Sequence, residues 1–303
     1  EAHSFSGETS TISARLADNF NNPVPDGTTV NFTTEGGVIE PSCSTLNGFC
    51  SVTWTSAEPR VDDHRITILA TAIGHETFFD TNGNNTFDDE DGSAIDDNNT
   101  ASGFTRHPAE PSGFIDMSEA WRDDNENLVR DTGEVFLDFN NNQEFTLRDG
   151  KFNGPQCQGA LCPDPDNDEE SSIHVRKALI LIMSGSQAKL GLSIDGILYL
   201  NTLTGQQVDL PDIAGGAITS LVLEYFDSAE QMLPVGSTIS ISSTVGNLEG
   251  TTSKVVQNTT QRRNLTFKIN NTDPELSGSG SLEINIVTPK GVSTNELIDI
   301  TLL

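Results

Sequence analysis

The sequence is poor in aromatic residues, in basic residues and in long hydrophobic runs. Only 6% of its 303 residues are aromatic, and 16 Lys and Arg stand against 45 Asp and Glu, which gives a formal net charge of −29. A phosphate backbone is bound by a basic surface, so this imbalance argues against nucleic-acid binding. No run approaches the roughly eighteen apolar residues that a membrane-spanning helix requires. We therefore expect neither a nucleic-acid partner nor membrane insertion by this part of the chain.

Catalytic signatures are missing as well. The sequence contains no G-x-S-x-G, no H-E-x-x-H, no phosphate-binding loop and no dinucleotide fingerprint, and its five His are scattered. Carboxylate pairs of the glycosidase type are so numerous here that they discriminate nothing. The sequence therefore predicts a protein that is not an enzyme, with a hydrolase as a weaker alternative. It starts at Glu1 without Met or a signal-like segment, which favours an excised part of a longer protein.

Cysteine is rare, and its four copies form two close pairs, Cys43 with Cys50 and Cys157 with Cys162. Pairs this close suit local disulfides, which persist in oxidising compartments. Two pairs of free thiols are the alternative. A zinc site is disfavoured because neither pair has C-x-x-C spacing or a nearby pair of His. We expect two disulfides and an exported protein, extracellular or periplasmic.

Alternation of apolar and polar residues, rather than a helical period, runs through both ends of the sequence and predicts an all-β fold. The segment "ADNFNNPVPDGTTVNFTTEGG" (17–37) aligns without gaps on "FDSAEQMLPVGSTISISSTVG" (226–246). The alignment places three turn residues on their counterparts, namely Asp18 on Asp227, Pro25 on Pro234 and Gly27 on Gly236. Each copy reads as a strand, a polar turn and a returning β-branched strand. The repeat predicts two copies of one module.

The D…P-V/L-P-x-G-T/S-T-V/I pattern of these copies resembles bacterial immunoglobulin-like domains of the invasin and intimin type, called group 1. The resemblance implies β-sandwiches in tandem on a bacterial surface protein, acting as spacers or adhesive tips. It further implies a cell-surface location, with outer-membrane anchoring through other parts of a parent chain. The expected partners are neighbouring domains of that chain and an unidentified protein or glycan on another surface.

The two copies differ by a long insertion. We expect a first sandwich at 1–186, with strands at about 10–73 and 173–184, and a second sandwich at 187–303. The first would be interrupted by an acidic insertion at 77–172. Between residues 80 and 170 there are 23 Asp or Glu against five Lys or Arg, so the acid is local rather than a salt-adapted surface. A long segment with few apolar residues needs another source of order.

Three segments of the insertion place oxygen-bearing side chains at positions 1, 3, 5, 9 and 12 of a twelve-residue loop, the spacing of EF-hand calcium loops. They are Asp80, Asn82, Asn84, Asp88 and Asp91; Asp123, Asn125, Asn127, Asp131 and Glu134; and Asp138, Asn140, Asn142, Thr146 and Asp149. With no flanking helices, they resemble the calcium loops of thrombospondin-type repeats. None of the three loops has the usual Gly at position 6. In the second loop this position is Leu128, and a Leu side chain disfavours the left-handed backbone conformation expected there. We expect about three Ca²⁺ sites; a solvated acidic linker is the alternative.

The sequence thus predicts a calcium-stabilised adhesion or spacer segment of a bacterial cell-surface protein. The alternative is a calcium-dependent, lectin-like module in which the insertion binds a carbohydrate. Trp121, next to the second loop, would be a sugar-stacking platform in that alternative. In the first interpretation it fills a small core within the insertion.

Overall fold

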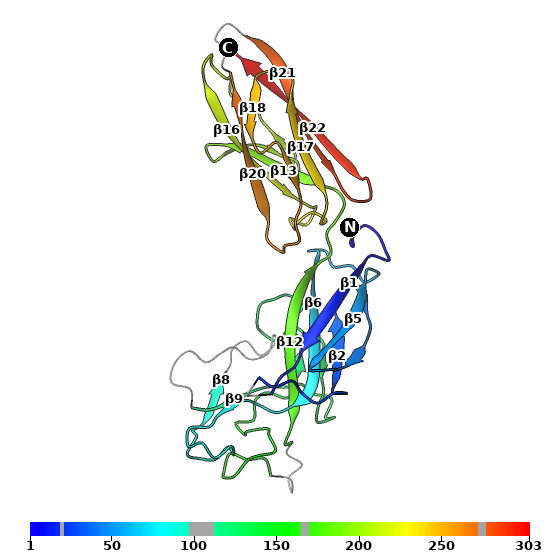
Figure 1. Ribbon diagram of the computed structural model, residues 1–303, viewed down its shortest axis with the longest axis vertical. Helices are drawn as coiled ribbons and strands as arrows, with labels where there is room; N and C mark the ends of the chain where they lie inside the picture. The colour runs from blue at the N-terminus through cyan, green and yellow to red at the C-terminus, as the bar shows by residue number, and fades with distance from the viewer. Residues whose placement is uncertain (19–20, 97–111, 165–169, 272–276) are drawn as a thin grey trace. The chain divides into compact units, whose positions relative to one another are not determined.

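The computed structural model describes residues 1–18, 21–96, 112–164, 170–271 and 277–303, and every regular element among them is a β-strand (Figure 1). The described residues contain no helix that is long and apolar enough to cross a membrane. The chain divides into two compact units, one of residues 9–59 and 66–181, the other of residues 1–8, 60–65 and 182–303. The all-β prediction is confirmed.

The first sandwich has a three-stranded and a four-stranded sheet. The first sheet has the order β1-β5-β3 and the second the order β12-β6-β2-β4. Their bounds are β1 Thr9–Arg15, β2 Thr29–Thr34, β3 Val38–Ile39, β4 Ser42–Ser44, β5 Phe49–Thr55, β6 Arg65–Gly74 and β12 Ile173–Ile182. Alternate side chains of β2 and β5 are buried, among them Phe32 and Trp54. The indole nitrogen of Trp54 donates to the carbonyl of Gly36 at 2.9 Å, so the largest core side chain also has its polar atom satisfied.

The second sandwich repeats this strand order. Its sheets are β15-β14-β13-β16-β20-β18 and β19-β17-β21-β22. The bounds are β13 Lys189–Ile194, β14 Ile197–Asn201, β15 Gln206–Gln207, β16 Ile218–Phe226, β17 Thr238–Ser243, β18 Asn247–Gly250, β19 Ser253–Val255, β20 Arg263–Asn270, β21 Gly278–Val287 and β22 Ser293–Leu302. Strands β16, β20 and β18 correspond to β1, β5 and β3, and β22, β21, β17 and β19 to β12, β6, β2 and β4. A continuous buried core of aliphatic residues with Tyr225 and Phe267 joins the two sheets.

The repeated turn has the same geometry in both copies. Asp18 accepts a hydrogen bond from the backbone nitrogen of Asn22 at 2.8 Å, and Asp227 accepts one from that of Gln231 at 2.9 Å. The residue before the closing donor is left-handed each time, with φ 64° at Asn21 and 62° at Glu230. An Asp that caps its own turn explains why this position recurs.

The predicted insertion lies between β6 and β12, and its residues 97–111 and 165–169 are outside the described part. It adds a three-stranded sheet, β7-β9-β8, and a two-stranded one, β10-β11. The bounds are β7 Phe78–Phe79, β8 Ala94–Asp96, β9 Gly113–Asp116, β10 Ala120–Trp121 and β11 Phe136–Leu137. Although its apolar residues are few, two buried clusters form, Phe87 with Phe114 and Phe152 inside the insertion, and Ile115 and Met117 with Ile173 of β12. Aromatic side chains bury a large area each, so a few of them suffice.

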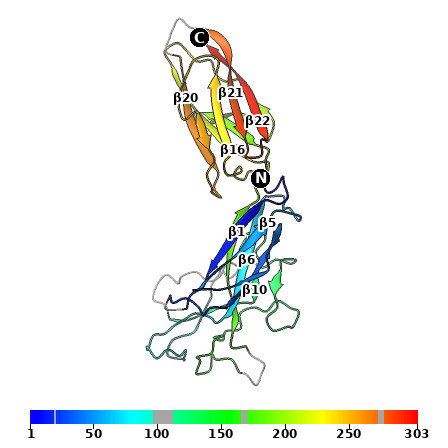
Figure 2. The ribbon, with the colours of Figure 1, turned by 45° about the vertical axis from the view of Figure 1, so that its right-hand side comes forward.

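The insertion, drawn with the sandwich in Figure 2, contacts β6 and β2 through the residues that follow β10. The hydroxyl of Thr67 donates to the carbonyl of Asp123 at 2.9 Å, and the Arg122 guanidinium donates to the carbonyl of Thr34 at 2.7 Å. Strand β6 is accordingly buried on both faces, with Ile66 and Ile68 on one and Thr67 and Leu69 on the other. The insertion is therefore anchored on the sandwich rather than hanging from it.

Candidate metal-binding loops

The three predicted loops share one backbone conformation. We call them loop 1 (80–91), loop 2 (123–134) and loop 3 (138–149). Their fourth and sixth positions are left-handed in every case, with φ 76° and 60° at Gly83 and Asn85, 58° and 64° at Glu126 and Leu128, and 58° and 65° at Asn141 and Gln143. Leu128 adopts the conformation that the sequence argument disfavoured for it. Left-handed backbone is costly for a non-glycine residue, so surrounding contacts must hold it.

The first Asp of each loop supplies those contacts by accepting hydrogen bonds from the backbone nitrogens of positions 5 and 6. In loop 2, Asp123 accepts from Asn127 at 3.1 Å and from Leu128 at 2.8 Å. The same pair of bonds joins Asp80 to Asn84 and Asn85, and Asp138 to Asn142 and Gln143. In each loop the carboxylate of the first residue therefore holds the following backbone in a turn.

The side chains of positions 3, 5 and 9 meet in each loop. In loop 2 the amide nitrogens of Asn125 and Asn127 both donate to the same oxygen of Asp131, at 2.8 and 2.7 Å. Asn82 and Asn84 do the same to Asp88, and Asn140 and Asn142 to the hydroxyl of Thr146. The sequence-predicted side chains at positions 3, 5 and 9 are thus brought together in all three loops, while that of position 1 bonds the backbone of positions 5 and 6.

The distal acid closes loops 1 and 2 with both of its oxygens. In loop 2, Glu134 accepts from the backbone nitrogens of Asp124 at 3.0 Å and Asp131 at 2.9 Å, which are positions 2 and 9. Asp91 closes loop 1 through the same positions, Thr81 at 2.7 Å and Asp88 at 3.1 Å.

Loop 3 departs from this pattern. Its predicted distal acid, Asp149, is exposed and accepts a hydrogen bond from the nearby nitrogen of Lys151. The bonds to positions 2 and 9 come instead from Glu119, which accepts from Phe139 at 2.7 Å and Thr146 at 2.9 Å. Glu119 precedes the loop, so a search confined to twelve-residue windows misses it.

The acids that close these loops are buried. Asp91 is 1% exposed, Asp123 and Glu119 are each 6% exposed, and Glu134 is 8% exposed. Across the described residues, none of these four carboxylates forms an ion pair with a Lys, Arg or His. Burying a carboxylate is costly unless hydrogen bonds or a counter-charge offset the cost, and here at least two backbone amides donate to each of the four.

The donor set is one of hard oxygens. In the described part of the chain, no three His, Cys, Asp or Glu side chains form a group that could hold a metal ion, so the three carboxylates of loop 1 and the three of loop 2 do not converge on one point here. Hydrogen bonds from Asn125 and Asn127 lower the pKa of Asp131, and those from Asn84, Glu90 and Asn82 lower the pKa of Asp88. Both carboxylates stay ionised over a wide pH range, as ligands of a hard cation must.

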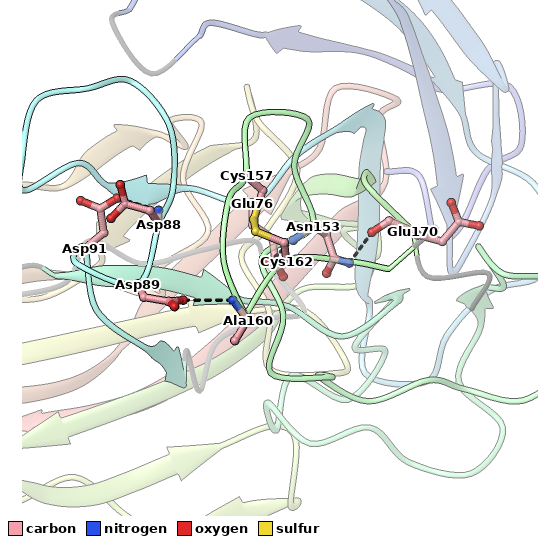
Figure 3. The surroundings of a disulfide bond; sticks show 9 residues. All are labelled: Glu76, Asp88, Asp89, Asp91, Asn153, Cys157, Ala160, Cys162 and Glu170. Atoms are coloured by element: carbon pink, nitrogen blue, oxygen red, sulfur yellow. Dashed lines mark hydrogen bonds between the residues drawn. A yellow bond between two sulfur atoms is a disulfide. The ribbon is translucent and has the colours of Figure 1, made fainter. Parts of the chain in front are cut away.

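Loop 1 is supported by the second disulfide. Phe87, its eighth residue, is fully buried and pairs with Cys157 through a β-bridge, with backbone bonds to Gln156 and Gln158. Cys157 is bonded to Cys162. In Figure 3 Asp88 and Asp91 lie on the loop, while Asp89 accepts a hydrogen bond from Ala160 of the disulfide segment at 3.2 Å.

Loops 2 and 3 are joined directly. Strands β10 and β11 pair Ala120 with Leu137 and Trp121 with Phe136, which closes loop 2 into a hairpin that leads into loop 3. Arg130, the eighth residue of loop 2, lies 5.4 Å from the ring of Phe145, the eighth residue of loop 3. Trp121 is 2% exposed, so it fills a core position and offers no platform for a sugar.

Both predicted disulfides are present, Cys43–Cys50 and Cys157–Cys162, and the described residues leave no free cysteine. Disulfides of this kind are typical of exported proteins.

The chain shows only weak similarity to known proteins. No protein-family model and no curated protein matches the chain. The D0-D1 domain of intimin is similar with a TM-score of 0.24 and 9% identity, over 97% of this chain and 90% of that one. The Yersinia pseudotuberculosis adhesin InvE has a TM-score of 0.26 and 12% identity, over 97% and 54%. An endo-fucoidan hydrolase from glycoside hydrolase family 107 has a TM-score of 0.23 and 10% identity, over 99% and 42%. TM-scores this low support no conclusion about the family or function of this chain.

Proposed function

We propose that this chain is a non-enzymatic, calcium-stabilised adhesion or spacer segment of a larger bacterial cell-surface protein. The observation that carries the calcium part is the set of three loops with one conformation, closed by buried carboxylates that have no ion-pair partner in the described residues. Tandem sandwiches, two disulfides and the sequence resemblance to group 1 domains support the surface part.

Calcium binding exchanges one set of contacts for another. In each loop the amide nitrogens of positions 3 and 5 now face the ninth side chain, and rotation of those amides turns their oxygens toward the ion. The first, ninth and distal side chains complete a site of six to eight oxygens at about 2.3–2.6 Å. The ion removes the repulsion among the acids and so stabilises the loop that holds them.

A thermal melt of the chain in millimolar calcium and in excess chelator tests this proposal. Ligand at a hundred times its dissociation constant adds about 2.7 kcal/mol per site, enough to raise a midpoint by several degrees. We expect calcium, and not magnesium, to restore the higher midpoint. Superimposable curves would reduce the loops to solvated linkers.

Substitutions in loop 2 locate the effect. Asp123→Ala and Glu134→Ala should each weaken calcium binding, because each removes a ligand, while the second sandwich stays folded. Glu126→Gln, which removes a charge at the non-ligand fourth position, is the matched control and should bind as the wild type does. Equal binding by all four proteins would show that the ligand assignment is wrong.

A further inference from the structure

In loops 1 and 2 the carboxylate that bonds positions 2 and 9 belongs to the twelfth residue of the loop. In loop 3 it belongs to a residue outside the loop. Among the described residues, the twelfth residue of loop 3, Asp149, accepts from the backbone nitrogen of Lys151 and does not bond the loop backbone at positions 2 and 9. Those two nitrogens, of Phe139 and Thr146, donate to the two oxygens of Glu119. The geometry matches that of Glu134 in loop 2 bond for bond.

Glu119 is also buried, as are the distal acids of loops 1 and 2. It is 6% exposed, and its oxygens accept hydrogen bonds from backbone amides alone, including a long one of 3.5 Å from Asn140. Within the described part of the chain no basic side chain pairs with it. Glu119, Asn140 and Thr146 line one cavity of about 190 Å³, so there is space next to the carboxylate; Asp149 lines the same cavity but does not bond the loop backbone at positions 2 and 9. Amide dipoles offset only part of the charge of a buried carboxylate.

We propose that Glu119, and not Asp149, is the distal carboxylate ligand of a calcium ion in loop 3. This assignment rests on the proposed calcium-binding function and adds to it a ligand from outside the twelve-residue window. The site then consists of Asp138, Asn140, Asn142, Thr146 and Glu119. Both of its carboxylates come from positions where backbone amides already orient them.

The assignment links loop 3 to loop 2. Glu119 immediately precedes β10, and β10 leads through Arg122 into Asp123, the first residue of loop 2. The backbone nitrogen of Glu119 also donates to the carbonyl of Thr146 at 3.0 Å. An ion held by Glu119 therefore fixes the strand from which loop 2 starts.

The test is the number of calcium ions bound by the full chain at saturation, measured by isothermal titration and by equilibrium dialysis. We expect the wild type to bind three, Glu119→Gln to bind two, and Asp149→Asn to bind three. Glu134→Gln, which removes the corresponding ligand of loop 2, is the matched positive control and should bind two.

The outcomes separate the assignment from the calcium proposal. No binding by the wild type overturns the calcium-binding function itself. Three ions in the wild type, two in Asp149→Asn and three in Glu119→Gln would overturn the assignment alone. Because Asp149 is exposed, Asp149→Asn remains folded and decides the question even if Glu119→Gln does not fold. Retention of three ions by Asp149→Asn supports Glu119, and loss of one contradicts it.

Discussion

The two sandwiches have the same strand order but differ at one connection. In the second, residues 288–292 join β21 to β22; in the first, residues 75–172 join β6 to β12 at the same place in the sheet. The short connection needs only a turn, in which Thr288 accepts from and donates to its neighbours. The long connection has its own buried clusters, its own disulfide and three loops rich in Asp, Asn and Glu. A β-sandwich can thus carry a large accessory structure at a strand connection, provided that structure is stabilised independently.

The largest expected effect comes from removing the aromatic core of the insertion. Phe87→Ala leaves a cavity against Phe114 and Phe152 and should lower the stability of the first unit by about 3–5 kcal/mol. Leu147→Ala, at a side chain 71% exposed, is the control and should change it by less than about 0.5 kcal/mol.

Tryptophan fluorescence during urea unfolding measures this effect selectively. Both Trp, at positions 54 and 121, belong to the unit that contains the insertion, and both Tyr, at 199 and 225, belong to the other unit. The Trp transition of Phe87→Ala should therefore move to lower urea concentration. An unchanged transition would mean that the insertion core contributes nothing to the unit.

A second effect, of a few kcal/mol, should depend on pH through Glu76. This residue is fully buried between β6 and β7 and accepts from the backbone nitrogens of Met117 at 2.6 Å and Asn153 at 2.9 Å. Burial raises the pKa of Glu76 from 4.5 to about 8, and the nearby Asp116 and Asp149 contribute to the rise. The folded state then binds this proton more tightly than the unfolded state, so stability falls as pH rises from about 4.5 to about 8. Each pKa unit corresponds to about 1.4 kcal/mol.

The acidic surface also weakens the fold as pH rises, so the informative quantity is a difference. We expect the Trp-detected stability of the wild type to fall more steeply between pH 5 and pH 8 than that of Glu76→Gln, in chelator throughout. Parallel slopes would show that Glu76 titrates in the folded protein as it does in the unfolded chain.

The smallest effect, about 1 kcal/mol, should distinguish loop 2 from the other loops. Leu128 holds a φ of 64° where loops 1 and 3 have Asn and Gln, and its side chain is half exposed. Leu128→Gly removes the steric cost of that conformation and should stabilise the folded unit, which the Trp-detected urea transition measures, while Val129→Gly, the control, should not. A lower urea midpoint for Leu128→Gly would mean that the Leu side chain stabilises the loop.

Sequence reasoning succeeded where the signal was local. Alternation gave the strands, the shared Asp and Pro-x-Gly gave the repeat, and close spacing gave both disulfides. The contacts within the loops are local too, since the first Asp bonds backbone four and five residues on and each Asn bonds backbone two residues on; that these residues ligate a metal stays a prediction.

It failed where partners are distant in the chain. Glu119 reaches loop 3 only because β10 pairs with β11, and no spacing rule connects it to Thr146. A small core around Trp121 was expected, but the cluster of Phe87, Phe114 and Phe152 was not, since the fold and the bridge to Cys157 bring these residues together. Leu128 was misjudged because propensity ignores the carboxylate of Asp123, which holds the strained turn.

The central claim is that calcium stabilises the insertion and leaves the second sandwich unaffected. Amide hydrogen exchange of the full chain, followed by mass spectrometry in calcium and in chelator, tests it region by region. We predict that chelation accelerates exchange in peptides covering loops 1, 2 and 3, while peptides from β16 to β22 exchange at the same rate in both conditions. Equal exchange of the loops with and without calcium would contradict the account.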